Sequence, residues 1–96
     1  MRGAQAYCLG RGGEQFSIEG DLCLLGRSRE AQMRFSSPRV SRRHALVRRW
    51  QGRYYIQDLG GRAGTYVNGR RVTTQALRSG DVIQLGDVEV EFREAQ

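Results

Sequence analysis

The stretch Ile83-Gln84-Leu85-Gly86-Asp87-Val88-Glu89-Val90-Glu91-Phe92 places a turn dipeptide between two segments rich in apolar residues. After the turn, apolar and charged residues alternate strictly, which is typical of a strand with one buried face. A shift of one residue would exchange the buried and exposed faces, so the register of this strand is firmly specified. The stretch therefore predicts a β-hairpin that turns at Gly86-Asp87 and directs Val88, Val90 and Phe92 into a core.

Strand-like segments recur along the rest of the chain, whereas helical periodicity is almost absent. Gln51-Gly52 and Asn68-Gly69 predict two more tight hairpins. Only residues 28–33 could hold a turn of helix. Turns at intervals of roughly 8–12 residues indicate an antiparallel sandwich or barrel. The expected strands are Ala6–Gly10, Gln15–Glu19, Cys23–Gly26, His44–Trp50, Arg53–Asp58, Thr65–Val67, Arg71–Val72, Asp81–Leu85 and Val88–Arg93.

Length and composition are those of one folded domain, which we expect to comprise residues 1–96. The chain is 39% hydrophobic and 27% charged, with 13 glycines and one proline, within the globular range. No stretch approaches the roughly 20 apolar residues that span a membrane, and the first seven residues contain no apolar signal core. We therefore expect a cytoplasmic protein without a membrane span.

The two cysteines, Cys8 and Cys23, each lie in an apolar segment. They are too few and too isolated for a zinc site or a disulfide framework. We expect buried, reduced thiols in neighbouring strands.

The net charge is +6, and all 16 basic residues are arginine. Arginine is a planar donor suited to phosphate and carboxylate groups, so this composition favours an anionic partner, although a GC-rich genome would also account for it. Nucleic acid is one such partner. The sequence disfavours it, because aromatic residues interleaved for base stacking are missing and Trp50, Tyr54 and Tyr55 fall in strand patterns that predict partial burial.

Catalytic chemistry has little support in this sequence. His44 is the only histidine, and Ser41, three residues before it, need not approach it as a nucleophile would. Neither paired carboxylates nor sets of metal ligands are visible. We expect no enzymatic activity, no metal and no cofactor.

Phosphate recognition is better motivated by the loop residues. Gly26 permits an unusual turn after an apolar strand, and Arg27 follows it in a loop. Ser41 and Arg42 place a hydroxyl and a second guanidinium shortly before the next strand. Charge-assisted, bidentate hydrogen bonds to phosphate are about twice as strong as neutral ones, so the combination predicts a phosphate-binding surface.

From about Cys23 to Phe92 the chain resembles the forkhead-associated (FHA) domain, a phosphothreonine-binding β-sandwich of two sheets. The resemblance implies an all-β, antiparallel two-sheet fold and a module that captures phosphorylated protein segments. The matching segments are Leu25-Gly26-Arg27, Val40-Ser41-Arg42-Arg43-His44-Ala45, Asp58-Leu59-Gly60, Gly64-Thr65-Tyr66-Val67-Asn68-Gly69, and Leu77 followed by Gly80-Asp81-Val82-Ile83-Gln84-Leu85-Gly86.

The resemblance also implies roles for individual residues. Arg27 would be the main phosphate ligand, Ser41 would donate its hydroxyl to a second phosphate oxygen, and Arg42 would contact phosphate or peptide backbone. His44 would brace the loop that carries Ser41. The residues implied to hold loop and hairpin shape are Gly26, Asn68 and Gly69.

The sequence departs from the family pattern in the loop before Thr65. Gly61 stands in a slot that usually holds serine, and Ala63 stands where an asparagine ordinarily clamps the peptide main chain. A missing side-chain hydrogen bond of about 1–2 kcal/mol would weaken binding roughly five- to thirtyfold. Arg62, between them, could add a cation near the phosphate.

Arg39 lies two residues before Ser41, at a loop position that in this family helps to read the residue three after the phosphothreonine. An arginine there suggests a preference for an acidic residue. The main alternative to phosphate recognition is an FHA-fold scaffold with a degenerate site that binds its partner without phosphate.

Overall fold

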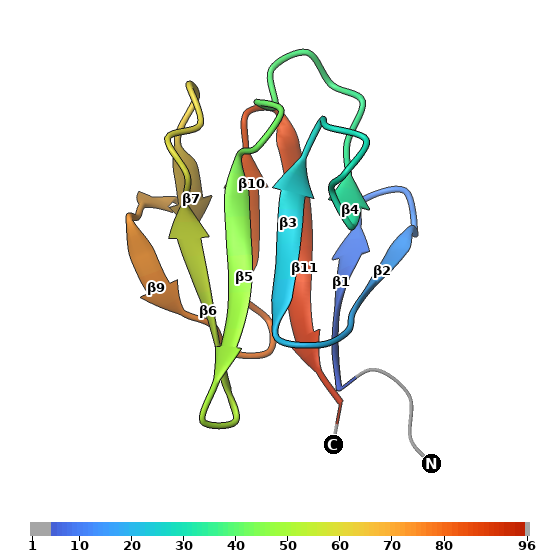
Figure 1. The fold of residues 1–96 in the computed structure, drawn as a ribbon, viewed down its shortest axis with the longest axis vertical. Helices are drawn as coiled ribbons and strands as arrows, with labels where there is room; N and C mark the ends of the chain where they lie inside the picture. The colour runs from blue at the N-terminus through green and yellow to red at the C-terminus, as the bar shows by residue number, and fades with distance from the viewer. Residues whose placement is uncertain (1–4, 96) are drawn as a thin grey trace.

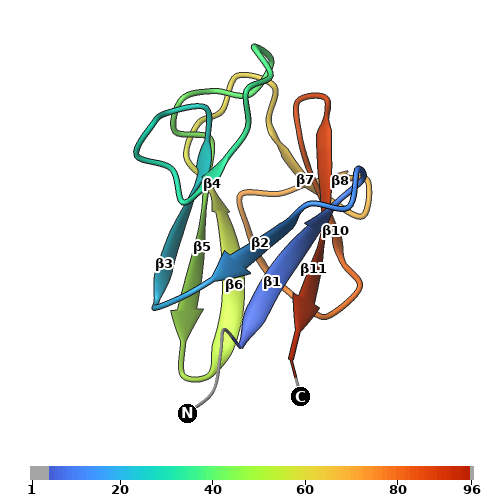
Figure 2. The same cartoon turned by 90° about the vertical axis from the view of Figure 1, so that its right-hand side faces the viewer.

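Two β-sheets packed face to face form the fold (Figures 1 and 2). The computed structural model describes residues 5–95, and no helix in this part of the chain could cross a membrane. One sheet has the strand order β2-β1-β11-β10-β7-β8 and the other β4-β3-β5-β6-β9. The strands are β1 (Ala6–Gly10), β2 (Gln15–Ile18), β3 (Leu22–Gly26), β4 (Met33–Arg34), β5 (Ala45–Trp50), β6 (Arg53–Asp58), β7 (Thr65–Val67), β8 (Arg70–Arg71), β9 (Thr74–Ala76), β10 (Val82–Leu85) and β11 (Val88–Glu94).

The hairpin turns have the predicted positions. Leu85 pairs with Val88 across the β10–β11 turn. In the β5–β6 turn Gln51 and Gly52 have φ of 50° and 76°, and in the β7–β8 turn Asn68 and Gly69 have φ of 53° and 84°. Two consecutive residues with positive φ match the right-handed twist of the strands that they join.

The core lies between the inner faces of the two sheets. Along β11, Val90 and Phe92 are buried and Val88 is half-buried, as the alternation predicts. The Tyr54 ring from one sheet packs against the Phe92 ring from the other, with centroids 5.5 Å apart. Each fully buried side chain of this size stabilises the fold by about 1.5–3 kcal/mol. The largest fully buried apolar side chains are Phe92, Leu25, Met33, Ile56, Ile83 and Leu85.

The structure corrects the expected arrangement of strands at the sheet edges. Strands β4 and β9 have no counterpart among the expected strands, and residues 28–33 form no helix. Strand β4 pairs with β3 in parallel, so the sandwich is mostly rather than wholly antiparallel. These two strands are short and, unlike β7 and β8, adjoin no turn dipeptide that would mark them, so only backbone pairing to a longer neighbour defines them.

Both cysteines are buried and unpaired. The expectation that they lie in neighbouring strands is wrong, because Cys8 is in β1 of one sheet and Cys23 in β3 of the other. The chain crosses from one sheet to the other between β2 and β3, so the two thiols face the core from opposite sides.

Four connections gather at the end of the sandwich opposite the β5–β6 hairpin, as Figures 1 and 2 show. They are the β3–β4, β4–β5, β6–β7 and β10–β11 loops. Segments far apart in the sequence thus meet at one end of the molecule.

Candidate functional site

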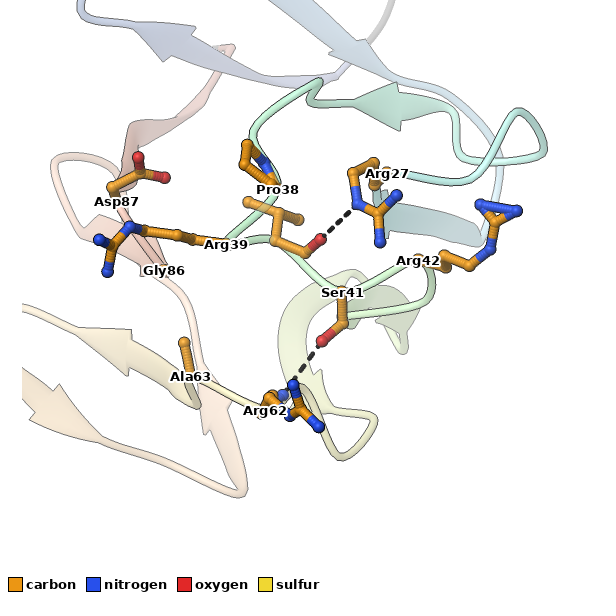
Figure 3. Close-up of a pocket in the computed structure, with 10 residues that line it drawn as sticks. Arg27, Pro38, Arg39, Ser41, Arg42, Arg62, Ala63, Gly86 and Asp87 are labelled. Atoms are coloured by element: carbon orange, nitrogen blue, oxygen red, sulfur yellow. Dashed lines mark hydrogen bonds between the residues drawn. The ribbon is translucent and has the colours of Figure 1, made fainter.

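A pocket of about 680 Å³ opens among these four loops (Figure 3). We call it the loop pocket. It brings together six residues that the sequence singled out, together with four others. Its lining residues are Arg27, Pro38, Arg39, Val40, Ser41, Arg42, Arg62, Ala63, Gly86 and Asp87.

Arg27 is held by the neighbouring loop at two points. Its backbone N–H donates to the Ser41 carbonyl oxygen at 3.0 Å, and its Nε–H donates to the Val40 carbonyl oxygen at 3.0 Å. The second bond fixes the plane of the guanidinium and leaves its two terminal NH₂ groups to bind an anion. A preoriented guanidinium loses less entropy on binding than a freely rotating one.

Gly26 is required for a different reason from the one expected. It ends β3 without positive φ, so it makes no unusual turn. Instead, a Cβ at this position would collide with the carbonyl oxygen of Arg42. The absence of a side chain lets the strand lie close to the loop that carries Ser41, and the Ser28 N–H bonds the same carbonyl at 3.0 Å.

His44 is fully buried and joins two of the loops. Its Nδ1 accepts the Ser41 N–H at 3.0 Å, so it carries no proton. The proton is therefore on Nε2, which donates to the Gly64 carbonyl oxygen at 2.8 Å. A neutral imidazole of this tautomer satisfies one backbone donor and one backbone acceptor inside the protein.

Ser41 completes a second connection between the same loops. Its Oγ accepts the backbone N–H of Arg62 at 3.1 Å, the bond drawn in Figure 3. The hydroxyl proton of Ser41 remains available to an anion in the pocket. The β4–β5 and β6–β7 loops are thus tied together both at the pocket surface and beneath it.

The β6–β7 loop is further braced by the Asp58 carboxylate. Its Oδ1 accepts the Thr65 hydroxyl at 2.7 Å, and its Oδ2 accepts the Gly60 N–H at 3.1 Å. Gly61 packs directly on the imidazole of His44, and a Cβ at this position would collide with the ring. Glycine in this slot therefore allows a close approach between loop and histidine that a serine would prevent.

The two predicted peptide-contact residues on this loop, Arg62 and Ala63, are exposed and line the loop pocket. The Ala63 methyl group offers no hydrogen bond to a ligand. The Arg62 guanidinium supplies a cation beside Ser41 (Figure 3).

Arg39 and Arg42 point in opposite directions from the β4–β5 loop. Arg39 extends toward Gly86 and Asp87 of the β10–β11 turn, and the Asp87 carboxylate accepts the Ser37 hydroxyl. Gly86, with φ of 61°, lies against the Arg39 carbonyl oxygen. Sequence reasoning missed Asp87 as a pocket residue, because its hairpin identified a turn but gave no sign of which loops it would meet.

The loop pocket has a strong excess of positive charge. Four arginines and one carboxylate line it. The two ion pairs found within residues 5–95 lie elsewhere and involve Arg11 and Arg93. Within the described residues no pocket arginine forms an ion pair with the protein's own carboxylates, so all four can pair with an anionic ligand.

Asn68 and Gly69 lie outside the loop pocket, in the β7–β8 turn. The Asn68 side-chain amide donates to Asp81 Oδ1 at 3.0 Å, and its oxygen accepts the Val82 N–H at 2.9 Å. These bonds join the turn to the start of β10. No group of three or more His, Cys, Asp or Glu residues that could hold a metal ion is present in the described part of the chain.

Comparison with known proteins identifies relatives in sequence and in fold. The FHA domain family model matches residues 23–86. Over 82 residues the chain is 35% identical to an oxoglutarate dehydrogenase inhibitor of Corynebacterium diphtheriae, covering 85% of this chain and 57% of that protein. The chain spans a little over half the length of the curated relative.

Two solved structures share the fold closely. One comes from a structural and functional analysis of phosphothreonine-dependent FHA domain interactions; it is 30% identical with a TM-score of 0.90, over 95% of this chain and 97% of that one. The other is Mycobacterium tuberculosis EmbR in complex with a low-affinity phosphopeptide; it is 28% identical with a TM-score of 0.91, over 97% of this chain and 25% of that one.

Proposed function

Because the chain belongs to the FHA domain family, we propose that it is a phosphothreonine-dependent protein-interaction module that captures phosphorylated segments of a partner protein in the loop pocket. The family is one of binding modules, and its members capture phosphorylated or acidic motifs through arginine-bearing loops. The observation that carries the proposal is the convergence of four arginines and the Ser41 hydroxyl in one pocket.

The proposed grip on phosphate uses Arg27 and Ser41. The terminal NH₂ groups of Arg27 bind two phosphate oxygens, and the Ser41 hydroxyl donates to a phosphate oxygen. Arg42 and Arg62 add positive charge at the rim. A phosphate group carries about −1.5 to −2 charges at neutral pH, so these groups distinguish a phosphorylated from an unmodified threonine.

His44 and Gly26 act in this proposal as positioning residues. The imidazole fixes the position of the Ser41 backbone through a hydrogen bond, and the absence of a side chain at Gly26 allows Arg27 to lie against the Ser41 loop. Neither group contacts the phosphate.

Arg39 selects the residue that follows the phosphothreonine by three positions, and we expect Asp or Glu to be preferred there. Its guanidinium extends away from Ser41 along the pocket, as such a role requires. An oriented phosphopeptide library checks the preference, and equal recovery of acidic and neutral residues at that position would contradict it.

The structures similar to this chain include FHA domains with phosphothreonine-dependent interactions and a phosphopeptide complex. A related protein is named as an enzyme inhibitor, which suggests regulatory signalling as the setting. Two unpaired cysteines accord with the cytoplasm as the compartment.

The test is a calorimetric titration with a threonine-phosphorylated peptide, its unmodified form and its phosphoserine form. Each of Arg27→Ala and Ser41→Ala removes at least one charge-assisted hydrogen bond, so we expect affinity to fall about ten- to a hundredfold. Arg70→Ala, an exposed arginine on β8 outside the pocket, is the matched control. Equal binding of the phosphorylated and unmodified peptides would refute the proposal and favour a scaffold that binds without phosphate.

A further inference from the structure

A second candidate surface lies on the outer face of the β4-β3-β5-β6-β9 sheet. Leu22 and Trp50 are the exposed large hydrophobic side chains of residues 5–95, and each is 58% exposed. Both lie on this face. Exposed apolar side chains scattered singly are ordinary, whereas a contiguous group marks an interaction site.

Strand register shows that the group is contiguous. Arg48 on β5 pairs with Leu22 on β3 and with Tyr55 on β6. Trp50 lies two residues after Arg48, so it projects from the same face of β5. We call these four residues, Leu22, Arg48, Trp50 and Tyr55, the Trp50 face.

The Trp50 face is hollowed as well as apolar. A groove of about 420 Å³ is lined by Arg48, Trp50 and Tyr55, with Gln57 and Thr74 beside them. Such a groove can take one aliphatic or aromatic side chain while the adjacent guanidinium and polar side chains bind its neighbours.

The charge of this face selects the partner. The outward-facing positions of β3, β5, β6 and β9 include Arg48 and Arg53 but no Asp or Glu. On the opposite sheet the outer face of β11 carries Glu89 and Glu91, together with Arg93, which pairs with Glu91. Arg48 is exposed between Leu22 and Tyr55, so its guanidinium is open to a carboxylate of the partner.

We propose that the Trp50 face binds an acidic protein segment that inserts an apolar side chain beside Trp50. Trp, Tyr and Arg are the residues that most often dominate binding energy at protein interfaces. Single-stranded nucleic acid fits less well, because base stacking along a strand requires several exposed rings. Here Trp50 is exposed, but Tyr55 is partly buried and the neighbouring Leu22 is aliphatic.

This surface is separate from the loop pocket. Ser41 lies in the loop before β5, and Trp50 is the last residue of that strand. The six residues of β5 therefore separate the two side chains by roughly 20 Å. Figure 1 shows the β5–β6 hairpin at the end opposite the pocket loops. The two sites can therefore be tested independently.

Trp50 is the only tryptophan in the chain, so its fluorescence reports on this face alone. The experiment selects unphosphorylated random peptides by display on the wild-type domain, after removal of those that also bind a Leu22→Ser/Trp50→Ser variant. We expect the recovered peptides to contain Asp or Glu next to an apolar residue. A synthetic peptide of that sequence should shift Trp50 emission to shorter wavelength in a saturable titration.

Three variants show where the peptide binds. Arg48→Glu, measured by anisotropy of a labelled peptide, should weaken binding at least tenfold. Arg70→Glu on β8 makes the same charge change elsewhere and should weaken it less than threefold. Arg27→Ala should leave the affinity unchanged. Urea unfolding of each variant checks that it is folded. If the Leu22→Ser/Trp50→Ser variant does not fold, the Arg48→Glu variant still tests the proposal.

Several outcomes would overturn the proposal. One is that no peptide is enriched over the double variant, and another is that the recovered peptides lack acidic residues. Loss of binding in Arg27→Ala would assign the peptide to the loop pocket. Saturable quenching of Trp50 by oligo(dT) without peptide binding would assign the face to nucleic acid. A dimer in sedimentation that Trp50→Ser abolishes would assign it to a second copy of the chain.

Discussion

The His44 imidazole holds two loops in fixed positions through one accepted and one donated hydrogen bond. Its ring is fully buried, and both partners are backbone groups, the Ser41 N–H and the Gly64 carbonyl. Because the two bonds use both ring nitrogens, no smaller side chain can reproduce them. The shape of the loop pocket therefore depends on a residue that is itself fully buried.

Replacement of His44 by Ala should lower the free energy of unfolding by about 3–5 kcal/mol. The change leaves two buried backbone groups without partners, at about 1–3 kcal/mol each, and opens a cavity in addition. Urea denaturation followed by circular dichroism measures the loss. Arg43→Ala, at the exposed neighbouring position, should change stability by less than about 0.5 kcal/mol. A loss below about 1 kcal/mol for His44→Ala would show that the two bonds contribute little.

Ala63 and Gly61 depart from the family pattern with different consequences. Ala63 is exposed in the pocket, so Ala63→Asn should add an amide without a steric conflict. We expect phosphopeptide binding about five- to thirtyfold tighter and an unchanged unfolding free energy. Isothermal titration calorimetry measures the gain, and an affinity equal to wild type would show that Arg62 already replaces the missing clamp.

Gly61→Ser should behave in the opposite way. A Cβ at this position would collide with the His44 ring, so either the loop or the imidazole has to move. We expect a loss of about 1–3 kcal/mol in stability, typical of overpacking, with weaker phosphopeptide binding. Urea unfolding curves of Gly61→Ser and Ala63→Asn, recorded together, compare the stabilities of the two variants. A Gly61→Ser variant as stable and as tight-binding as the wild type would show that the loop can relax.

Among the elements, the β5–β6 turn is predicted correctly by Gln51-Gly52, but its first residue is not ideal. Gln51 has φ of 50°, a region in which asparagine is better tolerated. We expect Gln51→Asn to raise stability by up to about 1 kcal/mol. Gly52 has φ of 76° and open space where a Cβ would lie, so Gly52→Ala should lose about 1–2 kcal/mol from backbone strain alone.

Thermal unfolding of the Gln51 and Gly52 variants measures both effects. The turn lies at the end of the sandwich opposite the loop pocket, so phosphopeptide affinity should not change in either variant. A change in affinity would indicate that strain passes along β5 to Ser41.

Strands β5, β6 and β11 could be predicted because each buries one face in alternation, and β3 because it is a continuous apolar run that ends at Gly26. Strands β4 and β9 could not, since Met33–Arg34 and Thr74–Ala76 are short, adjoin no turn dipeptide of the kind that marks β7 and β8, and are defined by backbone bonds to β3 and β6. By contrast, the alternation in β11 is long and strict, and the predicted register of that strand is confirmed.

At the scale of the whole molecule, the interface between the sheets contains two buried thiols. Burial raises the pKa of Cys8 to about 12, with a smaller contribution from Cys23, and burial raises the pKa of Cys23 to about 11. Between pH 9 and these values, the unfolded chain has lost thiol protons that the folded chain retains. Stability is therefore fully present below about pH 9 and falls as the pH rises.

Between about pH 8 and pH 10 we expect each thiol to contribute a loss of about 1 kcal/mol or slightly more. Urea denaturation at the two pH values measures it. A Cys8→Ala/Cys23→Ala variant should show a smaller loss of stability between the two pH values. Tyr54 contributes part of the loss that remains, because burial also raises the pKa of its hydroxyl. An equal loss in the variant and the wild type would assign the alkaline instability to other groups.

The sequence by itself determined the fold class and the positions of the residues that we propose to bind phosphate. Period-two alternation and turn dipeptides depend on local geometry, and the spacing of Arg27, Ser41 and His44 is a property of the chain. Only the tertiary structure brought Asp87 and Gly86 into the loop pocket, because a turn dipeptide says how the chain reverses and not which loops it meets. It also corrected the role of Gly26, whose nearest constraint is a carbonyl on another loop.

Trp50 and Tyr54 also show what the sequence could determine and what required the tertiary structure. The sequence predicted partial burial for both, yet Tyr54 is buried and Trp50 is 58% exposed. Both faces of β5 carry apolar residues, so the alternation defines two sides without identifying the one that meets the other sheet. Packing of the two sheets decided it, since the side with Ala45 and Val47 fits the core. The exposed Trp50 face is thus a product of tertiary structure.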